Sequence, residues 1–188
     1  MKKIGVLALQ GAFIEHVDMI KKLGHEAIQV RKSEQLDHIN GLIIPGGEST
    51  TMGKLLKDFS IKEPLIEKIK EGLPVWGTCA GLILLADTIE NDESVHLGQM
   101  EITAVRNAYG RQLGSFEYSG NIKGISANFP MVFIRAPYIG AVSENVDVIA
   151  TVNDHIVAAK QDNMLVTAFH PELTNDTRMH EYFLKMIK

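Results

Sequence analysis

Short apolar runs alternate with amphipathic segments through the first half of the chain. Residues 4–9 form a continuous apolar run, as expected of a strand buried on both faces, and further short strands are expected at residues 27–30, 42–44 and 74–77. Between them the pattern predicts helices that begin near Phe13, near Ser49 with a hydroxyl N-cap, near Glu63 and at Cys79. This alternation predicts a parallel sheet with helices on both faces, and ligands bind beyond the carboxyl ends of such strands.

The pattern changes after about residue 99. Short β-like runs follow one another at residues 101–105, 132–135, 146–152, 156–159 and 165–169. Asn153-Asp154 reads as a hairpin turn between two of them, and the segment from Asp176 onward has the apolar stripe of a helix. The expected fold is therefore α/β with three layers: a mostly parallel central sheet, helices on both faces and an antiparallel extension, in one domain of residues 1–188.

Composition and charge narrow the possible functions. A length of 188 residues suits one domain, and the net charge of −4 argues against nucleic acid or an anionic membrane as the main partner. No apolar run approaches a membrane span, and the run at 4–9 is too short for a signal peptide, so we expect a cytoplasmic protein. The single cysteine, Cys79, excludes an intramolecular disulfide and a cysteine-rich zinc site.

Cys79 stands in the segment Gly77-Thr78-Cys79-Ala80-Gly81, directly after an expected strand and before an expected helix. This pattern is typical of a nucleophile elbow, in which the flanking glycines let a strained turn pass close to its neighbours. A thiol at the start of a helix also lies near the positive end of the helix dipole, which favours the thiolate. A buried cysteine in a glycine-rich turn is the alternative.

His170 is the candidate base, in the sequence Phe169-His170-Pro171-Glu172. Residues two apart in extended backbone face the same way, so Glu172 would hold one imidazole nitrogen while the other faces the cysteine. A plain turn at a strand end is the alternative for this segment alone, and zinc on His170 and Glu172 would lack a third ligand. The other histidines have no comparable setting; they are His16, His25, His38, His96, His155 and His180.

A glycine pair, Gly46-Gly47, follows the expected strand at 42–44. Glycines allow backbone N–H groups to face a ligand. The N–H of Gly47, paired with that of Ala80, would form an oxyanion hole, in which one donor is worth ~10²–10³ in rate. A phosphate-binding turn or a plain loop are the alternatives, although a P-loop is not supported because no Gly-x-x-x-x-Gly-Lys is present.

Together these motifs resemble the class I, or triad, glutamine amidotransferases, which have a flavodoxin-like fold. The resemblance narrows to the glutaminase subunits of pyridoxal 5′-phosphate synthases and extends over essentially the whole chain. Besides the cysteine and histidine motifs, it is carried by residues 9–12, 45–52, 106–112, 133–137 and 158–161, which read LQGA, PGGESTTM, RNAYGRQ, FIRAP and AAKQ.

The resemblance implies a catalytic role for each motif. Cys79 would attack the amide carbon of L-glutamine and release ammonia, and water would then hydrolyse the glutamyl thioester. His170 would shuttle protons and Glu172 would orient it. Gly47 and Ala80 would form the oxyanion hole.

It also implies a binding site for glutamine, made by Gly46, Gly47, Glu48, Ser49, Arg106, Ile134 and Arg135. A guanidinium suits the α-carboxylate of glutamine, and a carboxylate such as that of Glu48 suits the α-ammonium. By spacing alone, however, Arg106 is better explained as a surface ion pair. Gln10 would lie in a loop near the oxyanion site that responds to a partner.

The partner implied by the resemblance is a (β/α)₈-barrel pyridoxal 5′-phosphate synthase subunit in a large hetero-oligomer, to which ammonia would pass internally. The glutaminase chain itself would bind no cofactor and no metal. Two alternatives stay open. One is a cysteine hydrolase of another substrate on a similar fold, such as a γ-glutamyl hydrolase or a DJ-1-like protein, although the PGGES loop and the spacing of His170 and Glu172 disfavour the latter. The other is a catalytically silent subunit that only docks and regulates a synthase.

Overall fold

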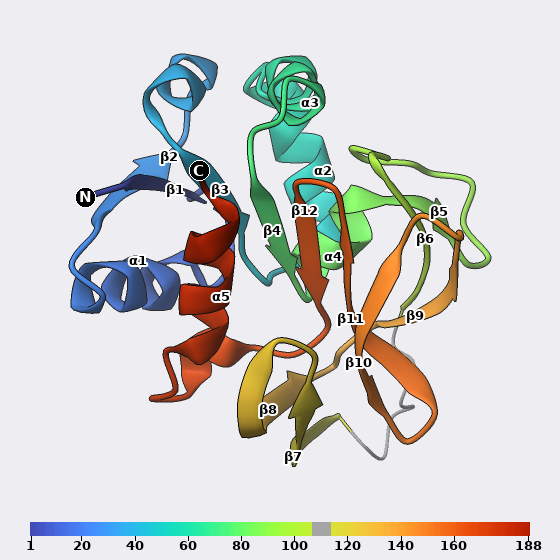
Figure 1. The fold of residues 1–188 in the computed structure, drawn as a ribbon. Coiled ribbons are helices and arrows are strands. Elements are labelled where there is room, and N and C mark those ends of the chain that lie inside the picture. Colours follow the sequence, from blue (N-terminus) through green and yellow to red (C-terminus); the bar gives the residue numbers. More distant parts are fainter. Residues whose placement is uncertain (107–113) are drawn as a thin grey trace.

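The computed structural model describes residues 1–106 and 114–188, and its centre is a ten-stranded mixed sheet (Figure 1). The strand order is β2-β1-β3-β4-β12-β11-β9-β6-β5, with β10 paired to β11. The parallel half is made of β1 (Lys3–Leu7), β2 (Glu26–Val30), β3 (Gly41–Ile44), β4 (Val75–Thr78) and β12 (Met164–Thr167). The four strands expected in the first half are therefore confirmed as parallel strands.

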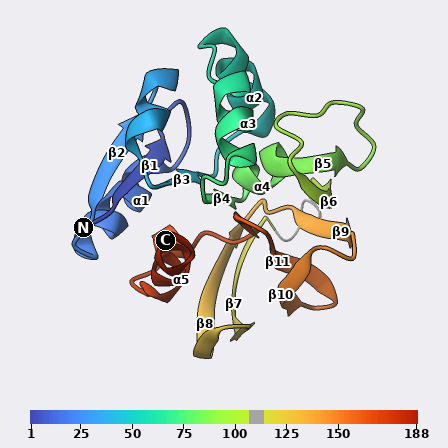
Figure 2. The ribbon, with the colours of Figure 1, turned by 45° about the horizontal axis from the view of Figure 1, so that its top comes forward.

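Two groups of helices cover the parallel strands on opposite faces (Figures 1 and 2). The α-helices are α1 (Phe13–Lys22), α2 (Ser49–Asp58), α3 (Lys62–Lys70), α4 (Ala80–Leu85) and α5 (Arg178–Met186). Two short 3₁₀ segments, η1 (Ser33–His38) and η2 (Pro171–Leu173), complete the described helical elements. Helices α1 and α5 share one face, where their side chains meet Trp76 of β4, and α2 packs against α4 on the other face.

Strand β12 corrects one expectation. The sequence pattern places the run at 165–169 in the antiparallel extension, but Met164–Thr167 pairs parallel to β4 and antiparallel to β11. All four residues of β12 are buried, as a strand in the middle of a sheet requires. The strand therefore joins the two halves of the sheet, and it brings the chain directly to His170.

The antiparallel extension is confirmed for β10 (Asp147–Val152) and β11 (His155–Gln161), and β11 also pairs antiparallel to β9 (Tyr138–Val142). The turn between β10 and β11 has positive φ at both Asn153 and Asp154, which matches the predicted hairpin. At the far edge β5 (Ala86–Ile89) and β6 (Met100–Val105) pair parallel to each other, and β5 and β9 are not anticipated by the sequence pattern.

The run at 132–135 does not join the main sheet, contrary to expectation. It belongs to β8 (Ile125–Ile134), which pairs with β7 (Ser115–Ile122) as a separate two-stranded antiparallel sheet. Alternate residues Phe129, Met131 and Phe133 are buried, and both phenylalanine rings contact Phe169 just after β12. The hairpin therefore packs face-on against the segment that carries His170, and its strands do not extend the sheet edge.

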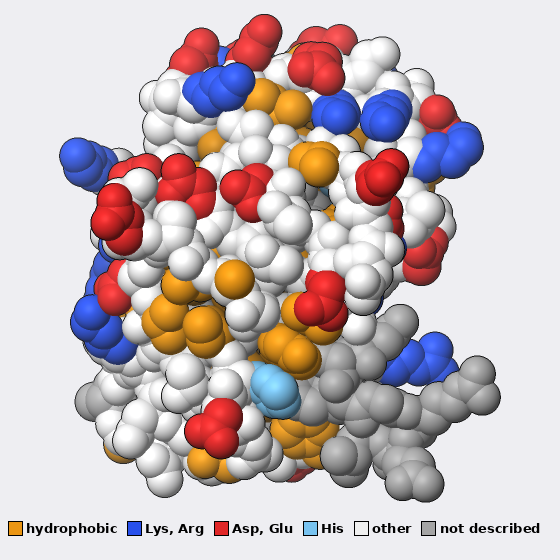
Figure 3. All heavy atoms as spheres, turned by 90° about the vertical axis from the view of Figure 1, so that its right-hand side faces the viewer, with side chains coloured by type: hydrophobic (Ala, Val, Ile, Leu, Met, Phe, Trp, Pro, Cys, Tyr) orange, Lys and Arg blue, Asp and Glu red, His pale blue; other side chains and the backbone are white. Residues whose placement is uncertain are grey.

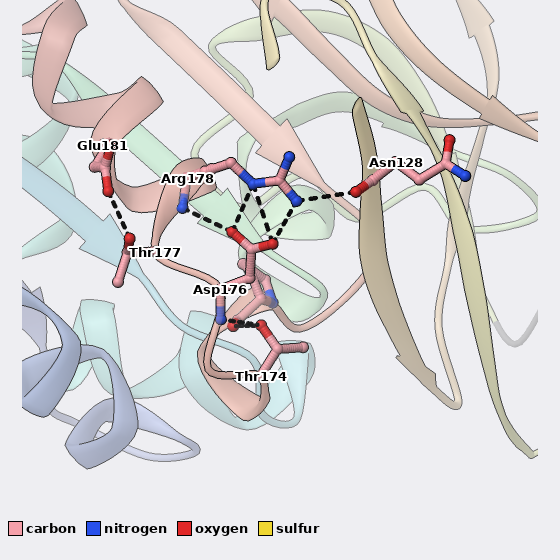
Figure 4. A network of polar contacts seen from close by, with 7 residues as sticks. Asn128, Thr174, Asp176, Thr177, Arg178 and Glu181 are labelled. Carbon is pink, nitrogen blue, oxygen red and sulfur yellow. Dashed lines mark hydrogen bonds and ion pairs between the residues drawn. The ribbon is translucent and has the colours of Figure 1, made fainter. Parts of the chain in front are cut away.

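An ionic network fastens this hairpin to the start of α5 (Figure 4). The guanidinium of Arg178 donates to both oxygens of Asp176 at 2.5–3.1 Å and to the carbonyl of Asn128 in β8 at 2.9 Å. The side-chain oxygen of Thr174 accepts from the Asp176 N–H at 3.2 Å and closes the turn before the helix. The second sheet is therefore bound to the chain between η2 and α5.

Charged side chains of both signs are interspersed on the face of the molecule shown in Figure 3. This distribution agrees with the small net charge of −4 and offers no single-signed field to a polyanion. Among the helices that the structure describes, none has the length and apolarity needed to cross a bilayer.

The turn between β4 and α4 leaves no room for a side chain at Gly81. A Cβ atom there would lie 2.3 Å from the carbonyl oxygen of Ile44 in β3, which is backbone and cannot rotate away. We expect Gly81→Ala to lower the free energy of unfolding by about 1–3 kcal/mol or more, even though alanine is the better helix former. Urea unfolding followed by circular dichroism measures the change.

Gly24→Ala is the matched control. Gly24 follows α1 with φ +79°, and an added methyl group would meet no atom within 4 Å, so only the strained backbone conformation opposes alanine there, at about 1 kcal/mol. Equal destabilisation in the two variants would contradict the steric explanation.

Candidate active site

Cys79 occupies a strained turn between β4 and α4. Its φ of 51° and ψ of −103° lie in a region that costs a non-glycine residue about 1–3 kcal/mol. Two backbone hydrogen bonds hold the turn: the Cys79 N–H donates to Thr167 O of β12 at 2.8 Å, and the Leu82 N–H donates to Cys79 O at 3.1 Å. The elbow geometry expected from the flanking glycines is present, although α4 begins at Ala80 and is only six residues long.

His170 and Glu172 form a direct pair beside this turn. His170 Nδ1 lies 2.6 Å from Glu172 Oε1, and the His170 N–H donates to Val132 O of β8 at 2.8 Å. The predicted pairing is present, but the extended backbone expected for it is wrong: Pro171 begins the 3₁₀ turn η2 with His170 as its N-cap. The turn brings the Glu172 carboxylate back under the imidazole.

The electrostatic setting makes the imidazole of His170 an unusually strong base. Burial alone would lower its pKa, but hydrogen bonds to the Cys79 thiol and to Glu172, together with the carboxylate charge, outweigh burial and raise the pKa to about 10. At neutral pH His170 is therefore protonated. A cationic imidazole within hydrogen-bonding reach of a thiol is the arrangement used to activate cysteine nucleophiles.

Glu172 is ionised although its side chain is fully buried. Burial raises the pKa of this carboxyl, yet its electrostatic interactions with His16 and His170 and the hydrogen bond with His170 lower it below the ordinary value. His16 Nε2 lies 3.4 Å from Glu172 Oε2, on the side away from His170. The expectation that no other histidine has a comparable setting is therefore wrong.

His16 of α1 and His180 of α5 form a second imidazole pair behind the first. His16 Nδ1 lies 2.9 Å from His180 Nε2, and both rings meet Trp76 in edge contacts with centroids 4.8–5.6 Å apart. Burial lowers the pKa of both histidines. The signal in the sequence is the position of each one on the apolar stripe of its helix, His16 beside Val17 and His180 beside Met179.

A cleft of about 480 Å³ opens in front of Cys79. It brings together eight of the residues predicted for the site: Gln10, Gly47, Glu48, Ser49, Cys79, Ala80, Arg106 and Arg135. Gly46, His170 and Glu172 are not among the lining residues, but Gly46 lies beside the catalytic side chains: a Cβ atom there would come within 2.4 Å of His170 Cε1 and 3.4 Å of Cys79 Cβ. Ile134 does not line the cleft either and is 38% exposed.

Glu48 is the N-cap of α2, a role that the sequence pattern assigns to the hydroxyl residues near Ser49. Its carboxylate accepts hydrogen bonds from the backbone N–H groups of Thr50 and Thr51 at 3.1 and 2.9 Å, and from the Thr51 hydroxyl. The Thr51 hydrogen bond is the main cause that lowers the pKa of Glu48. The carboxylate thus stays ionised at the cleft while it satisfies the first N–H groups of α2.

The loop before α1 holds the glycine pair in place. The Gly46 carbonyl accepts from the Ala12 N–H at 3.0 Å, and Gln10 Oε1 accepts from the Glu48 N–H at 2.9 Å. A Cβ on Gly47 would lie 2.4 Å from that same Gln10 oxygen. The direction of the Gly46–Gly47 peptide therefore depends on residues 10–12.

Two arginines reach the cleft from the antiparallel half. Arg106 Nη1 pairs with Asp92 Oδ2 at 2.6 Å, so the ion pair considered for this residue exists. Its buried Nε and Nη2 have no hydrogen-bond partner among the described residues. Arg135 follows β8 directly with φ +44°, and residues 107–112 of the predicted RNAYGRQ motif lie outside the described residues. Nowhere in residues 1–106 and 114–188 do three potential metal-ligating side chains cluster.

An α/β sheet with a cysteine on a strand-to-helix elbow and a histidine–glutamate pair at the neighbouring strand end defines a triad-type cysteine amidohydrolase. The sequence model of the SNO glutamine amidotransferase family matches residues 6–188, so the chain belongs to the SNO glutamine amidotransferase family.

Curated relatives agree along the full length. The chain is 53% identical over 189 residues to a protein of Ruminiclostridium cellulolyticum, with all of both chains covered. It is 56% identical over 186 residues to one of Carboxydothermus hydrogenoformans, covering 98% of this chain and 97% of the relative. Both relatives are named pyridoxal 5′-phosphate synthase subunit PdxT.

Solved structures agree on the fold. A crystal structure of a glutamine amidotransferase is 46% identical to this chain, with a TM-score of 0.94 and 98% of each chain covered. A PurLQS structure from Thermotoga maritima matches with a TM-score of 0.74 at 14% identity over the whole of both chains, which supports the fold alone. The predicted three-layer α/β fold is thus confirmed.

We expect acid to destabilise the protein through its buried histidines. Burial lowers the pKa of His16 and His180, so below the ordinary imidazole pKa of about 6.5 the unfolded chain binds protons that the folded chain does not. This stability is present above that pH and is lost as the pH falls. His180→Leu should reduce the loss between about pH 7 and pH 5.5, as measured by urea unfolding at each pH.

The exposed His38 provides the control, since His38→Gln should leave the pH dependence of the wild type unchanged. If His180→Leu lost as much stability in acid as the wild type, groups other than His180 would be the cause of that loss.

Proposed function

We propose that this chain is the glutaminase subunit of a pyridoxal 5′-phosphate synthase, hydrolysing L-glutamine to L-glutamate and ammonia. The observation that carries the proposal is the 2.6 Å pair of His170 and Glu172 beside Cys79. Cys79 lines a cleft, and the chain is 53–56% identical to proteins named PdxT.

The reaction runs in two halves. The Cys79 thiolate, paired with the His170 imidazolium, attacks the amide carbon of glutamine, and the imidazolium gives its proton to the leaving nitrogen, so that ammonia departs and a glutamyl thioester remains. Water then attacks the thioester, His170 takes its proton, and the sulfur leaves as glutamate is released. Glu172 holds Nδ1 at 2.6 Å throughout, which keeps Nε2 for the proton transfers.

The backbone N–H groups of Gly47 and Ala80 would stabilise the negative oxygen that develops in each half. Ala80 begins α4 directly after the nucleophile, and Gly47 lines the same cleft. Because Ala12 and Gln10 hold the loop around Gly47, a partner that shifts residues 10–12 would change this donor. This explains why Gln10 would serve as the partner-responsive residue.

Glutamine would be held by ion pairs to its α-carboxylate and its α-ammonium group. Arg135 and the guanidinium nitrogens of Arg106 that have no partner among the described residues suit the α-carboxylate, and the ionised Glu48 suits the α-ammonium. Gly46 and Ser49 would complete the binding loop. Ile134 would contribute through its backbone position next to Arg135, since its side chain is not among those that line the cleft.

The ammonia acceptor would be a (β/α)₈-barrel synthase subunit, in a large hetero-oligomer, with no cofactor bound to the glutaminase chain. Ammonia is protonated in water and then cannot act as a nucleophile. A closed passage between the two active sites would keep it neutral until it reacts.

The direct test is glutamate release by the pure chain, with and without the synthase subunit. We expect the synthase to stimulate glutaminase activity, because the Gly46–Gly47 loop depends on residues 10–12. Cys79→Ala should reduce glutamine-dependent synthesis by about 10⁴-fold or more, as loss of a triad member does. The same variant should keep the synthesis supported by added ammonium salts.

Equal synthesis from glutamine by Cys79→Ala and wild type would instead indicate a silent docking subunit. Turnover of γ-glutamyl peptides in preference to glutamine would assign the chain to another class of cysteine hydrolase.

Arg106 should act in binding more than in chemistry. Arg106→Gln removes the charge that would meet the α-carboxylate, and we expect KM for glutamine to rise about 10–100-fold with kcat changed less, as for the loss of a charged hydrogen bond. Asp92→Asn is the control, because it removes the partner ion of Arg106 and leaves the guanidinium in place. An unchanged KM in Arg106→Gln would leave Arg106 a structural ion pair.

A further inference from the structure

One oxygen of Glu172 has no hydrogen bond in the described part of the molecule. Oε1 is taken by His170, whereas Oε2 is buried and accepts none. A buried ionised oxygen left unpaired is expensive, so the nearest donor matters. That donor is His16, whose Nε2 lies 3.4 Å away, longer than a well-formed bond and shorter than any separation by water.

The protonation of His16 follows from its neighbours. If Nε2 lacked a proton, its lone pair would lie 3.4 Å from the ionised Glu172 Oε2 as well as from the Thr78 hydroxyl, and the two acceptors Nε2 and Oε2 would repel each other. Nε2 therefore carries the proton. Since burial keeps the ring neutral, Nδ1 is then an acceptor.

His180 supports this assignment from the other side. Its Nε2 lies 2.9 Å from His16 Nδ1, and a hydrogen bond there needs His180 to donate. The other ring nitrogen of His180, Nδ1, has no partner among the described residues and is then an unprotonated acceptor. In this assignment His180 donates to His16, and the Nε2–H of His16 lies 3.4 Å from both Glu172 Oε2 and the Thr78 hydroxyl.

The surroundings leave this chain of groups little freedom to rearrange. Both histidine rings are fully buried and lie against Trp76, whose indole N–H donates to Thr167 at 3.1 Å. The same Nε2 of His16 is also within hydrogen-bonding distance, 3.4 Å, of the hydroxyl of Thr78, the residue that precedes the nucleophile. Helices α1 and α5 therefore meet directly under the candidate triad.

We propose that His16 is a positioning residue of the triad, which directs its Nε2–H at the free oxygen of Glu172, and that His180 selects the tautomer of His16 that does so. The inference rests on the proposed glutaminase chemistry, which supplies the reaction it would serve. By holding the carboxylate from behind, His16 fixes the orientation and the charge of the group that orients His170.

The test compares three substitutions in the complex with the synthase. His16→Leu removes the donor, and we expect kcat for glutamine hydrolysis to fall about tenfold with KM within twofold, as for the loss of one charge-assisted hydrogen bond. His16→Gln retains an N–H donor and should restore kcat to within about threefold of wild type. His180→Leu removes the group that selects the His16 tautomer, and its kcat should lie between those of the other two variants.

Phe183→Leu is the matched control. Its ring is also fully buried against Trp76, with centroids 5.7 Å apart, but it makes no hydrogen bond in this chain of groups. We expect it to lose stability in urea while kcat stays within about twofold, since packing is all that it removes.

Alkylation by iodoacetamide gives a readout in the pure chain, because Cys79 is the only thiol. We expect slower labelling at neutral pH in His16→Leu and wild-type labelling in His16→Gln and Phe183→Leu. Unchanged kcat and labelling in His16→Leu, or equal losses in His16→Gln, would overturn the positioning role. If His16→Leu does not fold, His16→Gln and His180→Leu decide the question. An inactive wild type that still labels rapidly would instead refute the proposed function.

Discussion

The buried negative charge of Glu172 is the constraint on which the rest of the site depends. A carboxylate removed from water is tolerated only where donors and positive charge surround it. Here His170 approaches one oxygen at 2.6 Å and His16 faces the other at 3.4 Å. Strands β4 and β12 and helices α1 and α5 all contribute to that enclosure, so the fold and the chemistry share one requirement.

The nucleophile and the oxyanion loop meet a different constraint, which is space. Gly46 lies against the imidazole and the Cys79 Cβ, and Gly11, with a φ of +93°, lies so close to Gly46 that an added Cβ would stand 1.9 Å from the Gly46 oxygen. These close approaches allow backbone atoms to line the cleft where side chains would block it. The same backbone contacts tie the candidate oxyanion donor at Gly47 to the loop before α1.

The sequence is most informative where short-range chemistry decides the structure. The elbow at Cys79, the His170–Glu172 pair and the alternating strands and helices of residues 1–85 follow from local motifs and periodicity. The direction of β12 and the separate β7–β8 sheet do not follow, because a short apolar run carries no information about its pairing partner. His16 and His180 escape sequence reasoning because each stands on an apolar stripe, where a histidine looks like core.

The segment between His170 and α5 is hydrogen-bonded at two points to β8 of the β7–β8 hairpin. His170 N–H is bonded to Val132 O near one end, and the guanidinium of Arg178 is bonded to Asn128 O four residues earlier (Figure 4). These two hydrogen bonds hold residues 170 and 178 beside residues 132 and 128 of β8. The length of the segment 171–177 must therefore fit the distance between those two points on the strand. Arg135, which follows β8 at the cleft, and His170 are therefore held in position by the same strand. We expect side chains in the segment 171–177 to be replaced in evolution far more easily than the length of the segment can change.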